Sequence, residues 1–341
     1  MKEKEGRAMR LMDCTLRDES NVLGKGFPAD LTVLMRRGLI ENNIKTIEFG
    51  NAGGIGAYAL GNIAPLNDLE YLELAEPFAD RAELGMFLNA KRYRAENVAL
   101  AAGHGLKFLR IGAEPGMWER SVPIISEVKK QGLTARYSLM KAYIAAPEEA
   151  AREARELQDA GLDELTVMDS AGCMQPEETA AFFDVLTAAV DIPVLFHGHS
   201  NLGLAPANAL AALAHGAAGV DCGLLGMARS AGNIPTELMV ALLQQKGELM
   251  EVDFYGLMKF LEEELVPAMA EHGFRPALAP MDLILGLSGA HSSFLGTFKK
   301  IAAEEGVDPM RLIVETSKRN RRDPSEEQMR QAAEALREGT A

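Results

Sequence analysis

Short apolar runs alternate with longer amphipathic stretches along the first 250 residues, which is the pattern of repeated βα units. The apolar runs predict strands at residues 10–16, 46–50, 84–88, 108–111, 135–139, 164–168, 194–197 and 219–224. Helices are predicted after them at residues 28–42, 66–79, 95–103, 118–131, 147–160, 176–189, 204–215 and 235–246. Eight successive units without an antiparallel interlude fit a closed barrel better than an open sheet, so residues 1–250 are predicted to form a (β/α)8 TIM barrel.

The pattern changes at about residue 252, where helical periodicity continues without convincing strands. Helices are predicted there at residues 255–269, 293–305, 309–318 and 325–337. Residues 251–341 are therefore predicted to be a helical C-terminal domain that packs on the barrel and is not a catalytic unit of its own.

Composition narrows the function classes. The formal net charge of −14 argues against a nucleic-acid partner, because the basic cluster at residues 318–322 is better read as a helix end or an interface. The three cysteines are widely spaced and predict neither a disulfide framework nor a cysteine zinc site. A polar N-terminus and the lack of a long apolar segment predict no signal peptide and no membrane span. We expect a cytoplasmic protein. The sequence does not determine its oligomeric state, and a homo-oligomer is one of the alternatives.

The most informative segment is residues 192–201, where an apolar strand ends in two histidines. His197 and His199 are two positions apart, which places both imidazoles on one face of a strand. At the carboxyl end of a barrel strand such a pair forms half of a site for a divalent metal. The alternative is a pair of histidines that only make hydrogen bonds in a loop.

The end of the first predicted strand supplies a third candidate metal ligand. Asp18 with His197 and His199 makes a set of two histidines and one carboxylate, which suits Mn²⁺ or Mg²⁺ and leaves open positions for a substrate. A 2-oxo acid chelates such a metal through its carboxylate and keto oxygens, and the metal then favours enolate formation. Arg17 is the cation expected to face the developing enolate oxygen. Its alternative is an ion pair with Asp13 or Glu48.

Three further polar residues lie at predicted strand ends. Glu48, in an apolar strand, is interpreted as orienting Arg17 or a metal-bound water, or else as a buried structural partner. Ser170 fits substrate binding or helix capping equally well. Asn233 is a candidate fourth, oxygen ligand, but a turn or cap explains it almost as well.

Three segments in this order resemble the DRE-TIM metallolyase superfamily: residues 13–18, 197–205 and 226–237. Within the superfamily the chain is most similar to the 4-hydroxy-2-oxovalerate aldolases, through residues 67–73 and 289–295. The resemblance implies a barrel with a C-terminal helical domain, metal ligands at Asp18, His197 and His199, and enolate stabilisation by Arg17. It also implies that an acylating aldehyde dehydrogenase takes the released aldehyde as a partner enzyme.

The chain departs from the aldolase pattern in three places. Asn21 occupies the position of a histidine that serves the aldolases as a base, and an amide cannot hold a proton at neutral pH. His291 stands where the aldolases carry a tyrosine, and our hypothesis is that it replaces the missing base, with Asn21 as a hydrogen-bonding partner of the substrate. The alternative is that His291 only makes structural hydrogen bonds in a loop. Glu19, in place of a glycine, adds a carboxylate that alters substrate choice or supplies the base instead.

The leading hypothesis is a metal-dependent carbon–carbon lyase that cleaves a 4-hydroxy-2-oxo acid into pyruvate and an aldehyde through a pyruvate enolate. A second hypothesis is a Claisen-type condensation of an acyl-CoA with a 2-oxo acid, although residues 13–18 are not followed by the Gly-Glu-Gln typical of that branch. A third is a non-catalytic relative that keeps the metal site, which Asn21 favours and the retained Arg17 disfavours.

Overall fold

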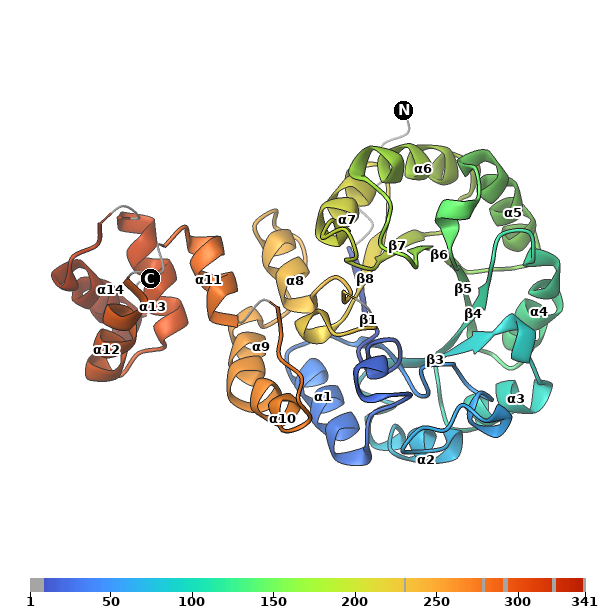
Figure 1. Cartoon of the computed structure of the whole chain (residues 1–341), viewed down its shortest axis with the longest axis horizontal. Coiled ribbons are helices and arrows are strands. Elements are labelled where there is room, and N and C mark those ends of the chain that lie inside the picture. Colours follow the sequence, from blue (N-terminus) through green and yellow to red (C-terminus); the bar gives the residue numbers. More distant parts are fainter. Residues whose placement is uncertain (1–8, 230, 278–279, 291–293, 321–322, 340–341) are drawn as a thin grey trace.

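Eight parallel strands close into a barrel in the computed structural model, which describes residues 9–229, 231–277, 280–290, 294–320 and 323–339. The strands are β1 (Arg10–Asp13), β2 (Thr46–Phe49), β3 (Glu83–Asn89), β4 (Phe108–Ala113), β5 (Thr134–Leu139), β6 (Glu164–Asp169), β7 (Val194–Gly198) and β8 (Gly219–Cys222). They pair in chain order, and β8 pairs with β1 to close the ring (Figure 1). The predicted TIM barrel is confirmed.

A helix follows each strand and covers the outside of the barrel (Figure 1). These helices are α1 (Ala29–Glu41), α2 (Asp68–Glu73), α3 (Ala95–Gly103), α4 (Val122–Lys130), α5 (Pro147–Asp159), α6 (Pro176–Ala189), α7 (Ala205–Ala214) and α8 (Thr236–Gln244). The helix predicted at residues 66–79 is shorter than expected. Asn67 caps its start in a capping box with Glu70, but Pro77 cannot donate a backbone hydrogen bond, and a separate short 3₁₀ turn surrounds it.

The barrel interior is polar at both ends and apolar between them. Met12 and Phe108 pack together inside the ring with Cys14. Arg110 of β4 and Arg136 of β5 occupy paired positions and both point inward, but their side chains diverge. Arg110 bonds to carboxylates nearer the carboxyl ends of the strands, and Arg136 bonds to carboxylates at their amino ends.

Helices alone make up the C-terminal part of the chain. They are α9 (Phe254–Phe260), a π-helical turn (Leu261–Leu265), α10 (Val266–Glu271), α11 (Pro280–Ser288), α12 (Leu295–Glu305), α13 (Pro309–Arg319) and α14 (Glu326–Glu338). The helix predicted at residues 255–269 is interrupted because Pro267 has no N–H for the carbonyl of Glu263, and the preceding turn widens to π geometry. α11 lies outside the predicted helices.

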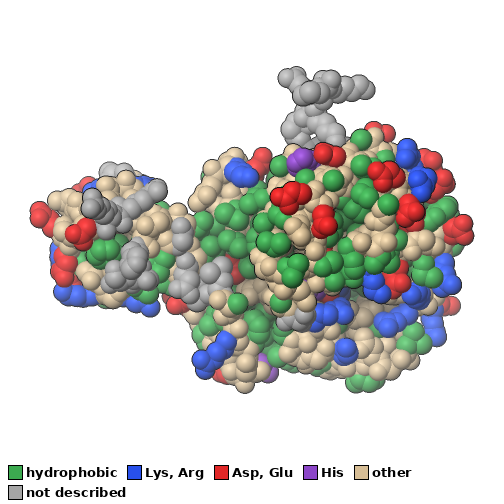
Figure 2. Space-filling model, turned by 45° about the horizontal axis from the view of Figure 1, so that its top comes forward, with side chains coloured by type: hydrophobic (Ala, Val, Ile, Leu, Met, Phe, Trp, Pro, Cys, Tyr) green, Lys and Arg blue, Asp and Glu red, His purple; other side chains and the backbone are tan. Residues whose placement is uncertain are grey.

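α9 packs beside α1 and α8, whereas α12, α13 and α14 pack on one another in a lobe that α11 joins to the rest (Figure 1). The lobe is a separate bulge in the space-filling view, and acidic and basic side chains both lie over the barrel's outer helices on the face shown (Figure 2). No helix of the described residues is both long and apolar enough to span a membrane. The domain boundary at residue 250 stays a prediction, and it falls between the end of α8 and the start of α9.

Candidate metal and enolate site

The end of β7 brings two imidazoles to the mouth of the barrel. His197 is the fourth residue of the strand and His199 follows its last residue, and their side chains are 1% and 5% exposed. Asp18 reaches them from the loop after β1, with its Oδ2 3.5 Å from the Nε2 atoms of both histidines. Three predicted ligands, far apart in the sequence, therefore face one another in a buried site.

The loop that carries Asp18 is held by the residue that ends β1. The Asp13 carboxylate accepts hydrogen bonds from the backbone N–H of Thr15 (2.9 Å) and the hydroxyl of Thr236 (2.7 Å). The backbone N–H groups of Arg17 and Asp18 then both donate to the carbonyl of Cys14, at 3.0 Å each. The strand is consequently shorter than the predicted residues 10–16, and the tight turn directs Asp18 inward.

The three side chains fit a divalent metal. Burial alone would raise the pKa of Asp18, but Arg17 and the two histidines hold it well below its usual value, so the carboxylate stays ionised. Burial, and then His197, lowers the pKa of His199 to about 4, which keeps that imidazole in the neutral form that binds metals. His197 Nε2 is buried without a hydrogen-bond partner among the described residues. Two nitrogens and one oxygen suit Mn²⁺ or Mg²⁺ with positions left for a substrate.

Asn233 lies against this set. Its Nδ2 donates to Asp18 Oδ2 at 3.1 Å and to Glu19 Oε1 at 2.7 Å. Its Oδ1 is buried and has no hydrogen-bond partner in the part of the chain that is described. The structure thus places Asn233 next to the predicted ligands, with an oxygen that is not otherwise engaged.

Arg17 is fixed by two carboxylates and keeps one nitrogen free. Its Nε donates to Glu48 Oε1 and its Nη1 donates to Asp18 Oδ1 at 2.7 Å. The guanidinium also lies 5.0 Å from the centroid of the Phe87 ring. Nη2 is buried and has no partner among the described residues, so it is a donor available to an anionic oxygen.

Comparisons with known proteins show the family of the chain. A family model described as HMGL-like matches residues 112–263. The 4-hydroxy-2-oxovalerate aldolase of Moorella thermoacetica is 33% identical over 92% of this chain and 92% of its own length. That of Carboxydothermus hydrogenoformans is 32% identical over 91% of both chains. The chain belongs to the HMGL-like family of 4-hydroxy-2-oxovalerate aldolases.

Solved structures of more distant proteins share the fold. Hydroxymethylglutaryl-CoA lyase from Pseudomonas aeruginosa is 18% identical with a TM-score of 0.66, over 82% of this chain and 98% of that one. The carboxyl transferase domain of Rhizobium etli pyruvate carboxylase, with oxamate and biotin, is 16% identical with a TM-score of 0.67, over 98% of this chain and 61% of that one. At such identities the likeness shows the barrel fold only.

Two residues of this aldolase-family site were missed from the sequence. Asp221 of β8 places Oδ2 3.3 Å from His197 Nδ1, so it orients the ring with Nε2 toward Asp18. Arg110 of β4 donates to Asp221 and to both oxygens of Glu48. The sequence signal for both is an ionisable residue at an inward position of a strand whose other residues are apolar or small.

The remaining predicted residues have different surroundings. Asn21 donates its side-chain N–H to the Asp18 carbonyl at 2.7 Å, so it braces the loop that carries the ligand. Ser170 accepts from the backbone N–H of Lys141 at 3.0 Å and does not cap α6, whose N-cap is Gln175. His291 lies outside the described residues.

Glu19 is fully buried behind Asn233. Burial, together with the carboxylates of Asp18 and Asp13, raises the pKa of Glu19 well above its usual value. A Cβ added at Gly223 would lie 2.2 Å from Glu19 Oε1, so the glycine leaves room for this carboxyl. The side chain therefore packs under the site, and it contacts Asn233 directly.

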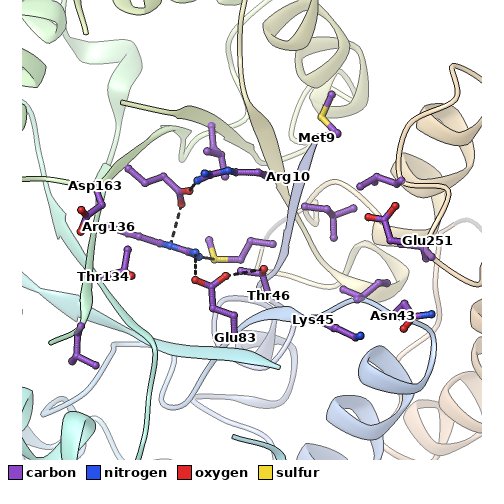
Figure 3. A pocket seen from close by; sticks show the side chains of 18 of the residues that line it. Met9, Arg10, Asn43, Lys45, Thr46, Glu83, Thr134, Arg136, Asp163 and Glu251 are labelled. Atoms are coloured by element: carbon purple, nitrogen blue, oxygen red, sulfur yellow. Dashed lines mark hydrogen bonds and ion pairs between the residues drawn. The ribbon is translucent and has the colours of Figure 1, made fainter. Parts of the chain in front are cut away.

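A large cavity of about 900 Å³ lies at the other end of the barrel (Figure 3). It is lined by residues at the starts of the strands, among them Arg10, Glu83 and Arg136, and by none of the proposed metal ligands. Because catalytic groups of a TIM barrel lie at the carboxyl ends of its strands, the metal and enolate site is the candidate catalytic site and this cavity is not.

Proposed function

We propose that this protein is a divalent-metal-dependent aldolase that cleaves a 4-hydroxy-2-oxo acid into pyruvate and an aldehyde. The observation that carries the proposal is the buried convergence of Asp18, His197 and His199 beside an Arg17 nitrogen that has no partner among the described residues. Family membership favours the aldolase over a Claisen-type condensation and over a non-catalytic metal-binding relative.

Each group of the site has a distinct task in this reaction. Asp18, His197 and His199 would hold a divalent metal, with the Asn233 oxygen as a further candidate ligand, and that metal would supply Lewis acidity toward the 2-oxo acid. Arg17 donates a hydrogen bond where negative charge develops on the substrate oxygen during carbon–carbon cleavage. Glu48 holds the guanidinium of Arg17 in place and does not itself need to reach the substrate.

The charges of the site match these ligands. Two buried guanidiniums, of Arg17 and Arg110, face three buried carboxylates, of Asp18, Glu48 and Asp221. The excess negative charge attracts a divalent cation, and with the cation present the site is positive and suits an anionic 2-oxo acid.

The acceptor of the substrate hydroxyl proton is proposed to be His291. Asn21 is no base, and its side-chain N–H is already bonded to the Asp18 carbonyl, which leaves its oxygen to accept a hydrogen bond from the substrate. Glu19 is the second candidate because its carboxyl contacts Asn233 beside the proposed ligands.

We also propose that the metal is Mn²⁺ or Mg²⁺. The released aldehyde is proposed to be consumed by an acylating aldehyde dehydrogenase. The test is pyruvate release from a panel of 4-hydroxy-2-oxo acids by protein stripped of metal and then given Mn²⁺ or Mg²⁺. Metal-dependent release supports the aldolase and identifies the aldehyde. No release, combined with metal-dependent exchange of the methyl protons of pyruvate, would contradict it and favour the condensing enzyme.

A further inference from the structure

Six buried side chains form a closed circuit of polar contacts at the carboxyl end of the barrel. In order around the circuit they are Arg17, Glu48, Arg110, Asp221, His197 and Asp18, and Asp18 contacts Arg17 again. Each of these side chains is at most 4% exposed. The circuit joins the proposed metal ligands to the arginine proposed to stabilise the enolate.

Arg110 links the part of the circuit that holds the metal ligands to the part that holds Arg17. Its Nε and Nη2 donate to the two oxygens of Glu48, at 2.6 and 2.7 Å, and its Nη1 donates to Asp221. Glu48 holds Arg17, and Asp221 holds His197. Within the described part of the chain Arg110 bonds to none of the three proposed metal ligands. It reaches the site through these two carboxylates and through Cys14, whose Sγ accepts from Nη2 at 3.4 Å.

We propose that Arg110 is a positioning residue that fixes the distance between the metal-binding half and the enolate-binding half of the site. The inference rests on the proposed function and assigns one more residue to it. A flat guanidinium with donors on three nitrogens holds two carboxylates in a defined mutual position, whereas an ammonium group is a point charge without this geometry. Arg110→Lys therefore keeps the charge and removes the geometry.

Arg136 offers a matched control. It is the register partner of Arg110 on β5, and it also bonds to two carboxylates, with Nη2 2.7 Å from Glu83 and Nε 3.2 Å from Glu164. Its side chain is 6% exposed. It lines the cavity at the starts of the strands, and Figure 3 shows it beside Glu83 and below the Arg10 side chain that bonds to Glu164. Of its two partners Glu164 is 3% and Glu83 38% exposed, so replacing Arg136 with lysine disturbs a partly buried ion-pair cluster far from the proposed metal site.

The experiment compares Arg110→Lys and Arg136→Lys by Mn²⁺ affinity, by kcat and KM for the best 4-hydroxy-2-oxo acid, and by thermal unfolding. We expect Arg110→Lys to weaken Mn²⁺ binding and to lower kcat by about 10- to 100-fold, because the native arginine orients groups that hold the metal. We expect KM to change little, because Arg110 does not reach the substrate. Arg136→Lys should lower the unfolding midpoint and leave kcat and Mn²⁺ affinity near those of the wild type.

Two outcomes would overturn the proposal: unchanged kcat and Mn²⁺ affinity in Arg110→Lys, or equal losses in Arg136→Lys, which would mark a general loss of packing. If Arg110→Lys does not fold, Glu48→Gln weakens the same link from its other end. Glu48 bonds to Arg17 and Arg110 and, within the described chain, to none of the proposed ligands, so weaker Mn²⁺ binding supports the circuit and unchanged binding overturns it. An inactive wild type would refute the proposed function alone, since Mn²⁺ titration still tests Arg110.

Discussion

At the scale of single residues, the site depends on groups that are buried and partly unpaired. Arg17 has two nitrogens bonded to carboxylates and one buried nitrogen without a partner in the described chain. Such a donor is costly to bury unless a ligand uses it. The same reasoning applies to the buried Asn233 oxygen, so both atoms mark where metal and substrate are expected to bind.

Arg17→Ala is expected to lower kcat by about 10²- to 10³-fold, the usual loss when one oxyanion donor is removed. Mn²⁺ affinity should be retained, because Asp18 loses a competing positive charge and keeps its place beside His197 and His199. Steady-state kinetics and Mn²⁺ titration measure the two effects separately. Wild-type kcat in this variant would exclude the enolate role.

Glu237 provides a pH test of stability. Burial raises the pKa of Glu237 from 4.5 to about 7, and its carboxylate accepts a hydrogen bond from the Leu225 N–H at 3.1 Å. Because the folded state prefers the neutral form, this stabilising contribution is present below pH 4.5 and is lost as the pH rises through 7. In metal-free protein, Glu237→Gln should gain stability relative to the wild type by up to about 3 kcal/mol between pH 5 and pH 8. A difference in unfolding free energy that does not change with pH would contradict this.

At the scale of elements, closure of the barrel requires β1 and β8 to approach closely at their first residues. Arg10 pairs with Gly219, and a Cβ added to this glycine would lie 2.2 Å from the Arg10 carbonyl oxygen. Backbone cannot move aside as a flexible side chain can. The glycine is therefore required by the packing of two strands, and its own backbone angles do not require it.

Gly219→Ala is expected to reduce the free energy of unfolding by about 1–3 kcal/mol, as overpacking of a core does. Gly103→Ala is the matched control, since this glycine lies in α3 with no atom near its added Cβ, and alanine there should stabilise by about 0.5–1 kcal/mol. Chemical denaturation of both variants measures the contrast. Equal effects of the two substitutions would show that the strand contact is unimportant.

At the scale of the whole molecule, the proposed ligands join both sides of the seam where the barrel closes. Asp18 follows β1, whereas the two histidines belong to the end of β7. A bound metal would therefore cross-link segments about 180 residues apart in the sequence, and it would stabilise the folded state by mass action.

Saturating Mn²⁺ should raise the unfolding midpoint of the wild-type protein, with a gain of about 2.7 kcal/mol when free metal exceeds its dissociation constant a hundredfold. The same addition should not stabilise His197→Ala. Calorimetry with and without Mn²⁺ provides the measurement. A midpoint that rises equally in both proteins would place the stabilising metal elsewhere.

The sequence by itself determined the barrel, because periodicity alternates between strand and helix regardless of how the units later pack. It also determined which kinds of side chain lie at the strand ends. His197 and His199 end an apolar strand at a spacing of two residues, which places both side chains on the same face. The tertiary structure decided which of these groups meet. Arg110 and Asp221 were not predicted, because a charged residue inside a strand acquires its role only when the ring closes and brings β2, β4 and β8 to face one another. The early end of β1 likewise depends on Thr236, which is distant in sequence and adjacent only in the fold.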